Sequence, residues 1–276
     1  MNKRLMIVGL GYSGAVVAAA AGADGWEVVS TTRGVVGPGQ VAFAQAGAAL
    51  PGITHLLMTA PPGEEGDPFL ATHGAALPGG LRWAGYLSTT GVYGDRGGGW
   101  VDEATEPAPG QPRSIRRLGA ELAWREAASG RFALDLFRVA GIYGPGRSVL
   151  DDLRSGQAQR TVKAGHAFGR IHVADIGRAV LAAMARPPEG VRVLNLTDDE
   201  AAGGAVVVAH GATLLGVPPP PERDYAQAAA GMSDMARSFW SENRRVGNAA
   251  TKAALGQAWL YPTYREGLAA IMQSGG

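Results

Sequence analysis

The chain has 276 residues, a formal net charge of +1, 46% hydrophobic and 18% charged residues, and no cysteine. This composition is typical of a globular chain and excludes intrinsic disorder, disulfides, thiolate catalysis and zinc–thiolate sites. The near-zero charge with no basic cluster argues against a nucleic-acid partner. No uncharged apolar run approaches ~20 residues, so we expect no membrane span and a cytoplasmic location.

The N-terminal segment has the order strand, glycine turn, helix. An apolar run at 5–8 precedes the turn, and an Ala/Val-rich stretch at 15–21 follows it. The spacing G-x-G-x-x-G suits a dinucleotide, because its glycines permit the tight turn, the approach of the pyrophosphate and close helix–strand packing. A plain Gly-rich turn is the alternative. We predict cofactor binding, with the phosphates at the helix N-terminus, by Gly9, Leu10, Gly11, Tyr12, Ser13 and Gly14.

The expected second strand, at 26–33, ends on Ser30-Thr31-Thr32-Arg33. A NAD-specific fold places a carboxylate here, about 20 residues beyond the glycines, where it binds the ribose 2′-hydroxyl. A hydroxyl-rich turn that ends in arginine favours a 2′-phosphate instead. Thr32 and Arg33 therefore predict NADP, with NAD the less favoured cofactor and an ordinary solvated loop arginine as the alternative.

Strands and helices then alternate, which is typical of a parallel α/β sheet. A strand at 53–59 ends abruptly on prolines, and ligands of such sheets lie outside the carboxyl ends of the strands. We therefore expect Thr59, Ala60 and Pro61 to line the cofactor, although a proline-terminated strand without ligand contact is nearly as good an interpretation. Further strands are expected at 40–43, 82–88, 133–139 and 191–196, and helices at 67–77 with Asp67 as cap, 113–129 and 173–185.

From about residue 147 the pattern loosens. Short helices are expected at 148–156 and 205–215, short strands at 160–163 and 170–172, and a final helix at 262–272 that starts on proline; 222–247 has no clear pattern. We predict a doubly wound parallel α/β sheet, the NAD(P)-binding Rossmann fold. Its core would comprise 1–146 plus 171–196, with a smaller C-terminal substrate lobe of 147–170 plus 197–276.

Several segments together resemble the extended short-chain dehydrogenase/reductase superfamily, which includes the NAD(P)-dependent epimerase/dehydratases. They are the glycine turn, S-T-T-G-V-Y-G at 88–94, Ala120-Glu121, Arg138 with I-Y-G-P-G at 142–146, and R-I-H-V-A-D-I at 170–176. The glycine spacing and the segments 241–246 and 260–268 are similar to an atypical subgroup. The resemblance implies an oxidoreductase-like protein with hydride transfer to or from a small carbonyl or hydroxyl substrate.

The resemblance also implies where catalysis would occur, and there the sequence departs from the family. Counting from Val92-Tyr93-Gly94 places the family's Ser/Thr on Thr89, while Glu121 places its Tyr and Lys on Arg113 and Arg117. Because a guanidinium stays protonated, Arg113 could polarise a carbonyl or bind an anion but could not shuttle a proton. Arg117 could donate to a ribose hydroxyl. A solvated helix face is an equal alternative for both arginines.

Other proton donors have weaker support. Tyr93 and Tyr143 in Y-G turns, His172, and Asp102-Glu103 are each expected to be structural, and no His or acidic residues show metal-ligand spacing. Arginines of the C-terminal lobe, which suit an anionic small-molecule substrate, are Arg147, Arg170, Arg237, Arg244 and Arg245. The sequence is compatible with a homodimer and does not decide the oligomeric state. The missing Tyr supports one alternative function, a non-catalytic NADP(H)-binding sensor or regulator; a sugar-nucleotide epimerase with the full mechanism is less favoured.

Overall fold

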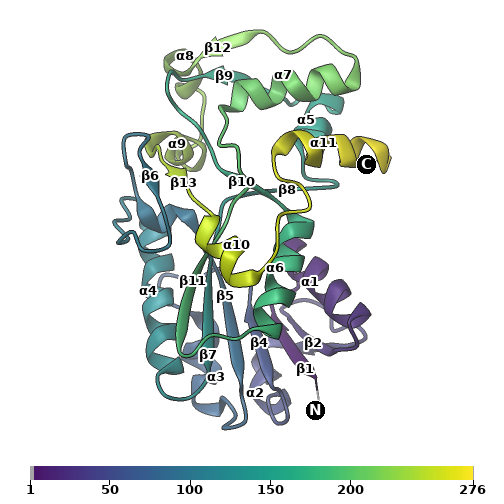
Figure 1. The fold of residues 1–276 in the computed structure, drawn as a ribbon, viewed down its shortest axis with the longest axis vertical. Coiled ribbons are helices and arrows are strands. Elements are labelled where there is room, and N and C mark those ends of the chain that lie inside the picture. The colour runs from purple at the N-terminus through teal and green to yellow at the C-terminus, as the bar shows by residue number, and fades with distance from the viewer. Residues whose placement is uncertain (1–2, 276) are drawn as a thin grey trace.

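The computed structural model describes residues 3–275, which form a seven-stranded parallel sheet with helices on both faces and a smaller lobe above its carboxyl edge (Figure 1). The strand order is β11-β7-β5-β4-β1-β2-β3. The strands are β1 (Arg4–Val8), β2 (Glu27–Thr32), β3 (Gln40–Ala42), β4 (His55–Met58), β5 (Trp83–Thr89), β7 (Ala133–Val139) and β11 (Val191–Leu196). All six pairings are parallel. The predicted doubly wound α/β fold is therefore confirmed.

Each face of the sheet has its own apolar core. Alternate residues of a strand point to opposite faces, so Leu5 and Ile7 belong to one core and Met6 and Val8 to the other. The first core is covered by α1 (Tyr12–Ala23), α6 (Val173–Ala185) and α10 (Ala249–Leu255). The second is covered by α2 (Ala46–Ala49), α3 (Pro68–His73) and α4 (Pro112–Ala128).

Two helix starts test the capping signals in the sequence. The Asp67 carboxylate accepts the Phe69 and Leu70 amides at 3.0 and 2.9 Å, which confirms the predicted cap of α3. The final helix, α11 (Tyr264–Gln273), does not start on its proline as predicted. Thr263 caps it instead, in a capping box with Glu266, because the reciprocal side-chain bonds satisfy amides at the helix start.

A buried ion pair joins α4 to the sheet. Arg138 of β7 and Glu121 of α4 are 2% and 0% exposed, and their charged atoms lie 2.9 Å apart. The Ser88 hydroxyl of β5 donates to the same carboxylate, and the guanidinium lies 4.7 Å from the centre of the Tyr93 ring. This network fixes α4 beside the carboxyl end of β5.

The smaller lobe consists of short elements around a third apolar cluster, to which Tyr143, Leu150, Val207 and Leu268 contribute. One strand pair, β9 (Arg160–Val162) with β12 (Glu222–Asp224), lies within it, and a second, β8 (Gly141–Tyr143) with β10 (Arg170–His172), lies where it meets the sheet (Figure 1). Its helices are α5 (Val149–Arg154), α7 (Gly204–Leu215), α8 (Tyr225–Ala229), α9 (Asp234–Ser241) and α11. The segment 222–247, which had no sequence pattern, thus holds β12, α8, α9 and β13 (Arg245–Val246), and β13 pairs with β6 (Trp100–Val101).

Candidate active site

The first and third glycines of the N-terminal turn are required by the backbone and by packing. Gly9 has φ +94°, and a Cβ there would lie 3.1 Å from Thr59 Oγ1 and 3.2 Å from the Ala60 amide. A Cβ at Gly14 would lie 2.7 Å from the Gly9 carbonyl oxygen. Neither position accepts a side chain without displacing the neighbouring chain.

The second glycine is different, because it faces open space. A Cβ at Gly11 would meet no atom within 4 Å, and the residue is exposed. Gly11 is the N-cap of α1 without a side-chain cap, the first turn has no acidic residue, and the first helical bond runs from the Ala15 amide to the Gly11 carbonyl. The amides of residues 12–14 thus lack a helical acceptor. The turn fits the pyrophosphate of a dinucleotide, for which these amides and Gly11 would form the cradle.

Hydroxyls of the neighbouring strands hold the turn in shape. The Gly9 amide donates to Thr31 Oγ1 at 3.1 Å, and the Thr59 hydroxyl donates to the carbonyls of Val8, at 3.1 Å, and Gly9. Thr59 and Ala60 therefore pack directly against the turn. Sequence patterns did not predict this contact of Thr31, because it depends on β2 lying next to β1 in the sheet.

Arg33 lies beyond the end of β2, exposed and with no acidic partner among the side chains that the structure describes. Thr32 Oγ1 accepts the Gly34 amide at 3.0 Å, which orders the turn that carries Arg33. No carboxylate follows β2 at this position. The guanidinium is thus available to an anionic group placed at the end of β2.

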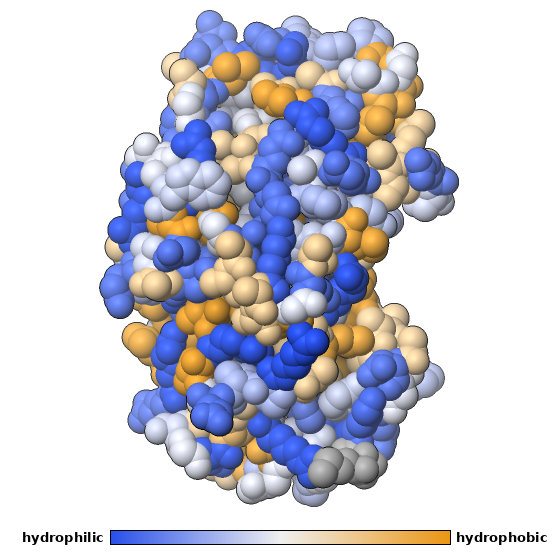
Figure 2. Space-filling view, in the orientation of Figure 1, coloured by the Kyte–Doolittle hydropathy of each residue, from blue (hydrophilic) through white to orange (hydrophobic). Residues whose placement is uncertain are grey.

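Tyr12 connects the glycine turn to the smaller lobe. Its hydroxyl donates to the Pro145 carbonyl at 3.0 Å, and the Arg147 guanidinium lies 5.6 Å from the centre of its ring. A Cβ at Gly144 would lie 2.4 Å from the Tyr12 hydroxyl, so the Y-G-P-G turn approaches this tyrosine closely. Figure 2 shows the outline indented on the right between the two parts of the molecule.

Thr89 and the start of α4 meet across Gly91. A Cβ at Gly91 would lie 3.3 Å from Thr89 Oγ1 and 2.6 Å from Ser114 Oγ. Thr89 Oγ1 accepts the Gly91 amide at 3.1 Å, as the cap of the short 3₁₀ helix η3 (Thr90–Tyr93). The oxygen is thereby fixed while the hydroxyl proton stays available to an acceptor. The structure thus supplies a positioned donor at the carboxyl end of β5.

The two arginines at the expected Tyr and Lys positions have different surroundings. Arg117 donates to the Leu87 carbonyl near the carboxyl end of β5 at 2.6 Å, so it is not a freely solvated side chain. Arg113 is exposed, and its guanidinium lies 4.8 Å from the centre of the Phe239 ring of α9. A second contact between these elements, 3.0 Å long, runs from Gln111 to Ser241. Neither guanidinium can exchange a proton near neutral pH.

The buried tyrosines considered as proton donors have structural hydrogen bonds. The Tyr93 hydroxyl donates to Asn195 at 2.8 Å, and the Tyr143 hydroxyl donates to the Thr263 carbonyl at 3.3 Å. Burial raises the pKa of both hydroxyls, which makes proton release less favourable.

The other candidate donors also have local partners. His172 Nδ1 accepts the Ala174 amide at the start of α6, and burial lowers the pKa of this histidine. Glu103 accepts the Thr251 hydroxyl and amide. Asp102 accepts the hydroxyl of nearby Thr105. The expected structural interpretation of each fits these contacts.

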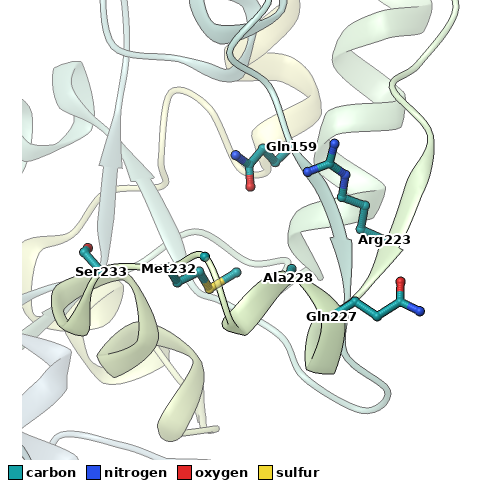
Figure 3. Close-up of a pocket in the computed structure, with 7 residues that line it drawn as sticks. Gln159, Arg223, Gln227, Ala228, Met232 and Ser233 are labelled. Atoms are coloured by element: carbon teal, nitrogen blue, oxygen red, sulfur yellow. The ribbon is translucent and has the colours of Figure 1, made fainter.

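The arginines of the smaller lobe are divided between structural contacts and cavities. Arg244 and Arg245 donate to the carbonyls of Gly94 and Gly98, so both hold β13 in place. Arg237 donates to the Ala229 carbonyl at 3.4 Å. A groove of about 630 Å³ lies beside β12, and Figure 3 shows two of its lining residues, Arg223 on β12 and Gln159 just before β9. Sequence reasoning missed Arg223, which lies in the unpatterned segment.

The part of the chain that the structure describes has no arrangement suited to metal binding or to spanning a membrane. Among the described side chains, no group of three His or acidic residues is placed to hold a metal ion. None of the helices in that range combines the length and apolar character needed to cross a bilayer.

Comparison with known proteins places the fold. No family model matches the chain. A conserved protein of unknown function from Silicibacter pomeroyi is 40% identical, covers 99% of both chains and superimposes with a TM-score of 0.90. The human epimerase family protein SDR39U1, solved with NADPH, is 17% identical over 98% of this chain and 99% of its own, with a TM-score of 0.81.

One curated relative is named as a reductase. The 3-diazoavenalumate denitrifying reductase from a Streptomyces species is 32% identical over 168 residues. The match covers 59% of this chain and 54% of the reductase, so the chain spans about half the length of that relative. The chain belongs to the same family as the Silicibacter pomeroyi protein, and its fold is that of the NAD(P)-dependent epimerase/dehydratases of the short-chain dehydrogenase/reductase superfamily.

Proposed function

We propose that this protein binds NADP(H) and acts as an oxidoreductase of the epimerase/dehydratase class on a small carbonyl or hydroxyl substrate. The observation that carries the proposal is the open, uncapped start of α1, where Gly11 and the amides of residues 12–14 can surround a pyrophosphate. The NADPH in the human neighbour and the reductase activity of the Streptomyces relative support the same class.

The bound nicotinamide would supply the hydride chemistry, and the chain would supply binding and polarisation. The Thr89 hydroxyl would donate to the substrate oxygen, because its own oxygen is fixed by the Gly91 amide. Arg113 would add positive charge or bind an anionic substrate group from the opposite side of Gly91. Arg117, held on the Leu87 carbonyl, would donate to a cofactor hydroxyl. The proton would come from water, since the Tyr93 and Tyr143 hydroxyls are held in structural hydrogen bonds.

The Arg113 and Arg117 positions also support a second function. A protein that keeps the cofactor cradle but has lost the proton-donating tyrosine could be a non-catalytic NADP(H) sensor. NADPH fluorescence on mixing, followed by turnover assays with aldehydes, ketones and imines, separates the two functions. Tight binding without turnover on the whole panel would favour the sensor, and absence of any NADPH or NADH binding would overturn both.

Arg33→Ala tests the choice of NADP. We expect the affinity for NADPH to fall by about 10- to 100-fold, the value of one or two charge-assisted hydrogen bonds, while the affinity for NADH changes little. Fluorescence titration with both cofactors measures the two constants. Arg223→Ala removes another exposed arginine far along the chain and should change neither. Equal losses for both cofactors would refute the assignment of NADP.

Thr89→Val tests the proposed donor. We expect kcat to fall by about 100-fold or more, because a positioned donor stabilises charge that develops on the substrate oxygen. Thr89→Ser keeps the hydroxyl and should retain most of the activity. Cofactor affinity should be unchanged in both variants. Unaltered turnover in Thr89→Val would mean that this hydroxyl does not touch the reacting group.

A further inference from the structure

The core of the smaller lobe contains a pocket of about 180 Å³ that the proposed active site does not use. It lies between the β8–β10 pair and the helices α5, α7 and α11. Its wall is mostly apolar, with Val207 and Val208 from α7 and Leu268 from α11. Cavities of about 150 Å³ are large enough to hold benzene, so the volume suits a small ring or a branched chain.

A fixed cation borders this apolar space. Arg170 lines the pocket, and its Nη1 donates to the carbonyls of Phe168 and Ala202 at 3.0 and 2.9 Å. These two bonds hold the guanidinium in one orientation and use only one of its nitrogens. The remaining N–H groups can donate hydrogen bonds to a ligand. A guanidinium matches a carboxylate in shape and charge.

The Tyr264 hydroxyl is a second unused donor. Its side chain lines the pocket and is 0% exposed, and its hydroxyl forms no hydrogen bond of ordinary geometry, although the Glu200 carboxylate lies close enough to act on it. Burial and the nearby Glu200 carboxylate raise the pKa of this hydroxyl, so it keeps its proton. A buried donor without an acceptor costs free energy, and an acceptor in the pocket would remove that cost.

The Asp198 carboxyl is the nearest competitor for the charge of Arg170. Arg170 forms its hydrogen bonds with backbone oxygens, and both Asp198 carboxyl oxygens lack a partner. Burial raises the pKa of Asp198 to about 7, with Arg170 opposing the shift. Because the hydrogen bonds of Arg170 go to backbone carbonyls, no direct ion pair with Asp198 occupies the guanidinium among the described contacts.

We propose that this pocket binds a small apolar carboxylate, with its ring or branched chain against Val207 and Leu268 and its carboxylate on Arg170 and Tyr264. The site is separate from the glycine turn and from Thr89, so it goes beyond the proposed oxidoreductase function. Tyr143 lies in the wall, next to the turn that contacts Tyr12. A ligand here would thus contact Tyr143, two residues before Pro145, whose carbonyl accepts the Tyr12 hydroxyl.

Isothermal titration with benzoate, and with benzamide as its neutral analogue, tests the proposal. We expect saturable benzoate binding to the full chain and at least tenfold weaker binding of benzamide, because only benzoate has a charge for Arg170. The benzoate affinity should be the same with and without NADPH. No benzoate binding up to about 20 mM, a concentration at which even a weak fragment-sized ligand is detected, would overturn the proposal. Equal binding of both molecules would overturn it as well. Displacement of benzoate by NADPH would place it in the cofactor cleft and overturn it as well.

Two variants of the pocket wall, with a control on the exposed side of α7, test whether benzoate binds in this pocket. Gly204 begins α7 at the pocket wall, and a Cβ there would have only Trp240 near, at 4.0 Å, so Gly204→Leu should fold and obstruct the pocket. We expect it to weaken benzoate binding at least tenfold, whereas Val206→Leu on the exposed side of the same helix should not. Tyr264→Phe should weaken benzoate several-fold without loss of Tm, since it removes a hydroxyl that forms no hydrogen bond of ordinary geometry. Unchanged benzoate affinity in Gly204→Leu would place the ligand elsewhere.

Discussion

Gly11→Val is expected to lower the affinity for both NADPH and NADH by about 100-fold or more, with the folded chain unchanged. The backbone at Gly11 has φ −85° and ψ −166°, which any residue adopts, and a Cβ there meets no atom within 4 Å. A valine therefore costs the protein little. Its methyl groups would occupy the space where a pyrophosphate approaches the start of α1. The substitution should therefore lower cofactor affinity without lowering the stability of the fold.

Binding titrations and thermal unfolding of three glycine variants separate these effects. Gly22→Val lies in the same helix, is exposed and also meets no atom within 4 Å, so both cofactor affinity and cofactor selectivity should persist. Gly14→Val should lower Tm, because its Cβ would lie 2.7 Å from the Gly9 carbonyl oxygen. Wild-type affinity in a folded Gly11→Val protein would show that the turn is not a phosphate site.

The parts of the fold predicted from the sequence are those with local signals. The run at 5–8, the glycine turn and the helix after it follow one another directly, and the structure has them as β1, the turn and α1. Asp67 followed by Pro68 is a complete cap signal within two residues. These segments could be predicted because the periodicity, the cap and the turn residues that specify each element all lie within it.

The parts that were missed depend on partners far away in the chain. β13 pairs with β6 across more than a hundred residues, and each strand has only two residues, so neither shows a pattern of its own. The site shows the same dependence. The surroundings of Arg113 come from Phe239 of α9, and those of Arg117 from a carbonyl of β5. The residue types could be read from the sequence, but their partners required the fold.

Glu121→Gln is expected to destabilise the protein by about 3–5 kcal/mol, the cost of leaving a buried charge without its partner. Arg138 is 2% exposed and Glu121 is 0% exposed, so water cannot compensate the guanidinium. Ser88 would keep an acceptor in the glutamine, which means that the loss comes from the charge of Glu121 and not from its volume. Urea unfolding measures the change as a lower midpoint at constant m-value.

A double variant shows whether the pair stabilises the fold or only satisfies its own charges. Glu121→Leu with Arg138→Met replaces both ions by apolar groups of similar size, which in buried pairs is often neutral or stabilising. We expect the double variant to be more stable than Glu121→Gln. Asp24→Asn, in the exposed Lys3–Asp24 pair, should cause no measurable change. If Glu121→Gln also unfolds at the wild-type urea midpoint, the Arg138 charge must be compensated by another group. The placement of α4, and with it that of Arg113 and Arg117, would then not depend on the ion pair.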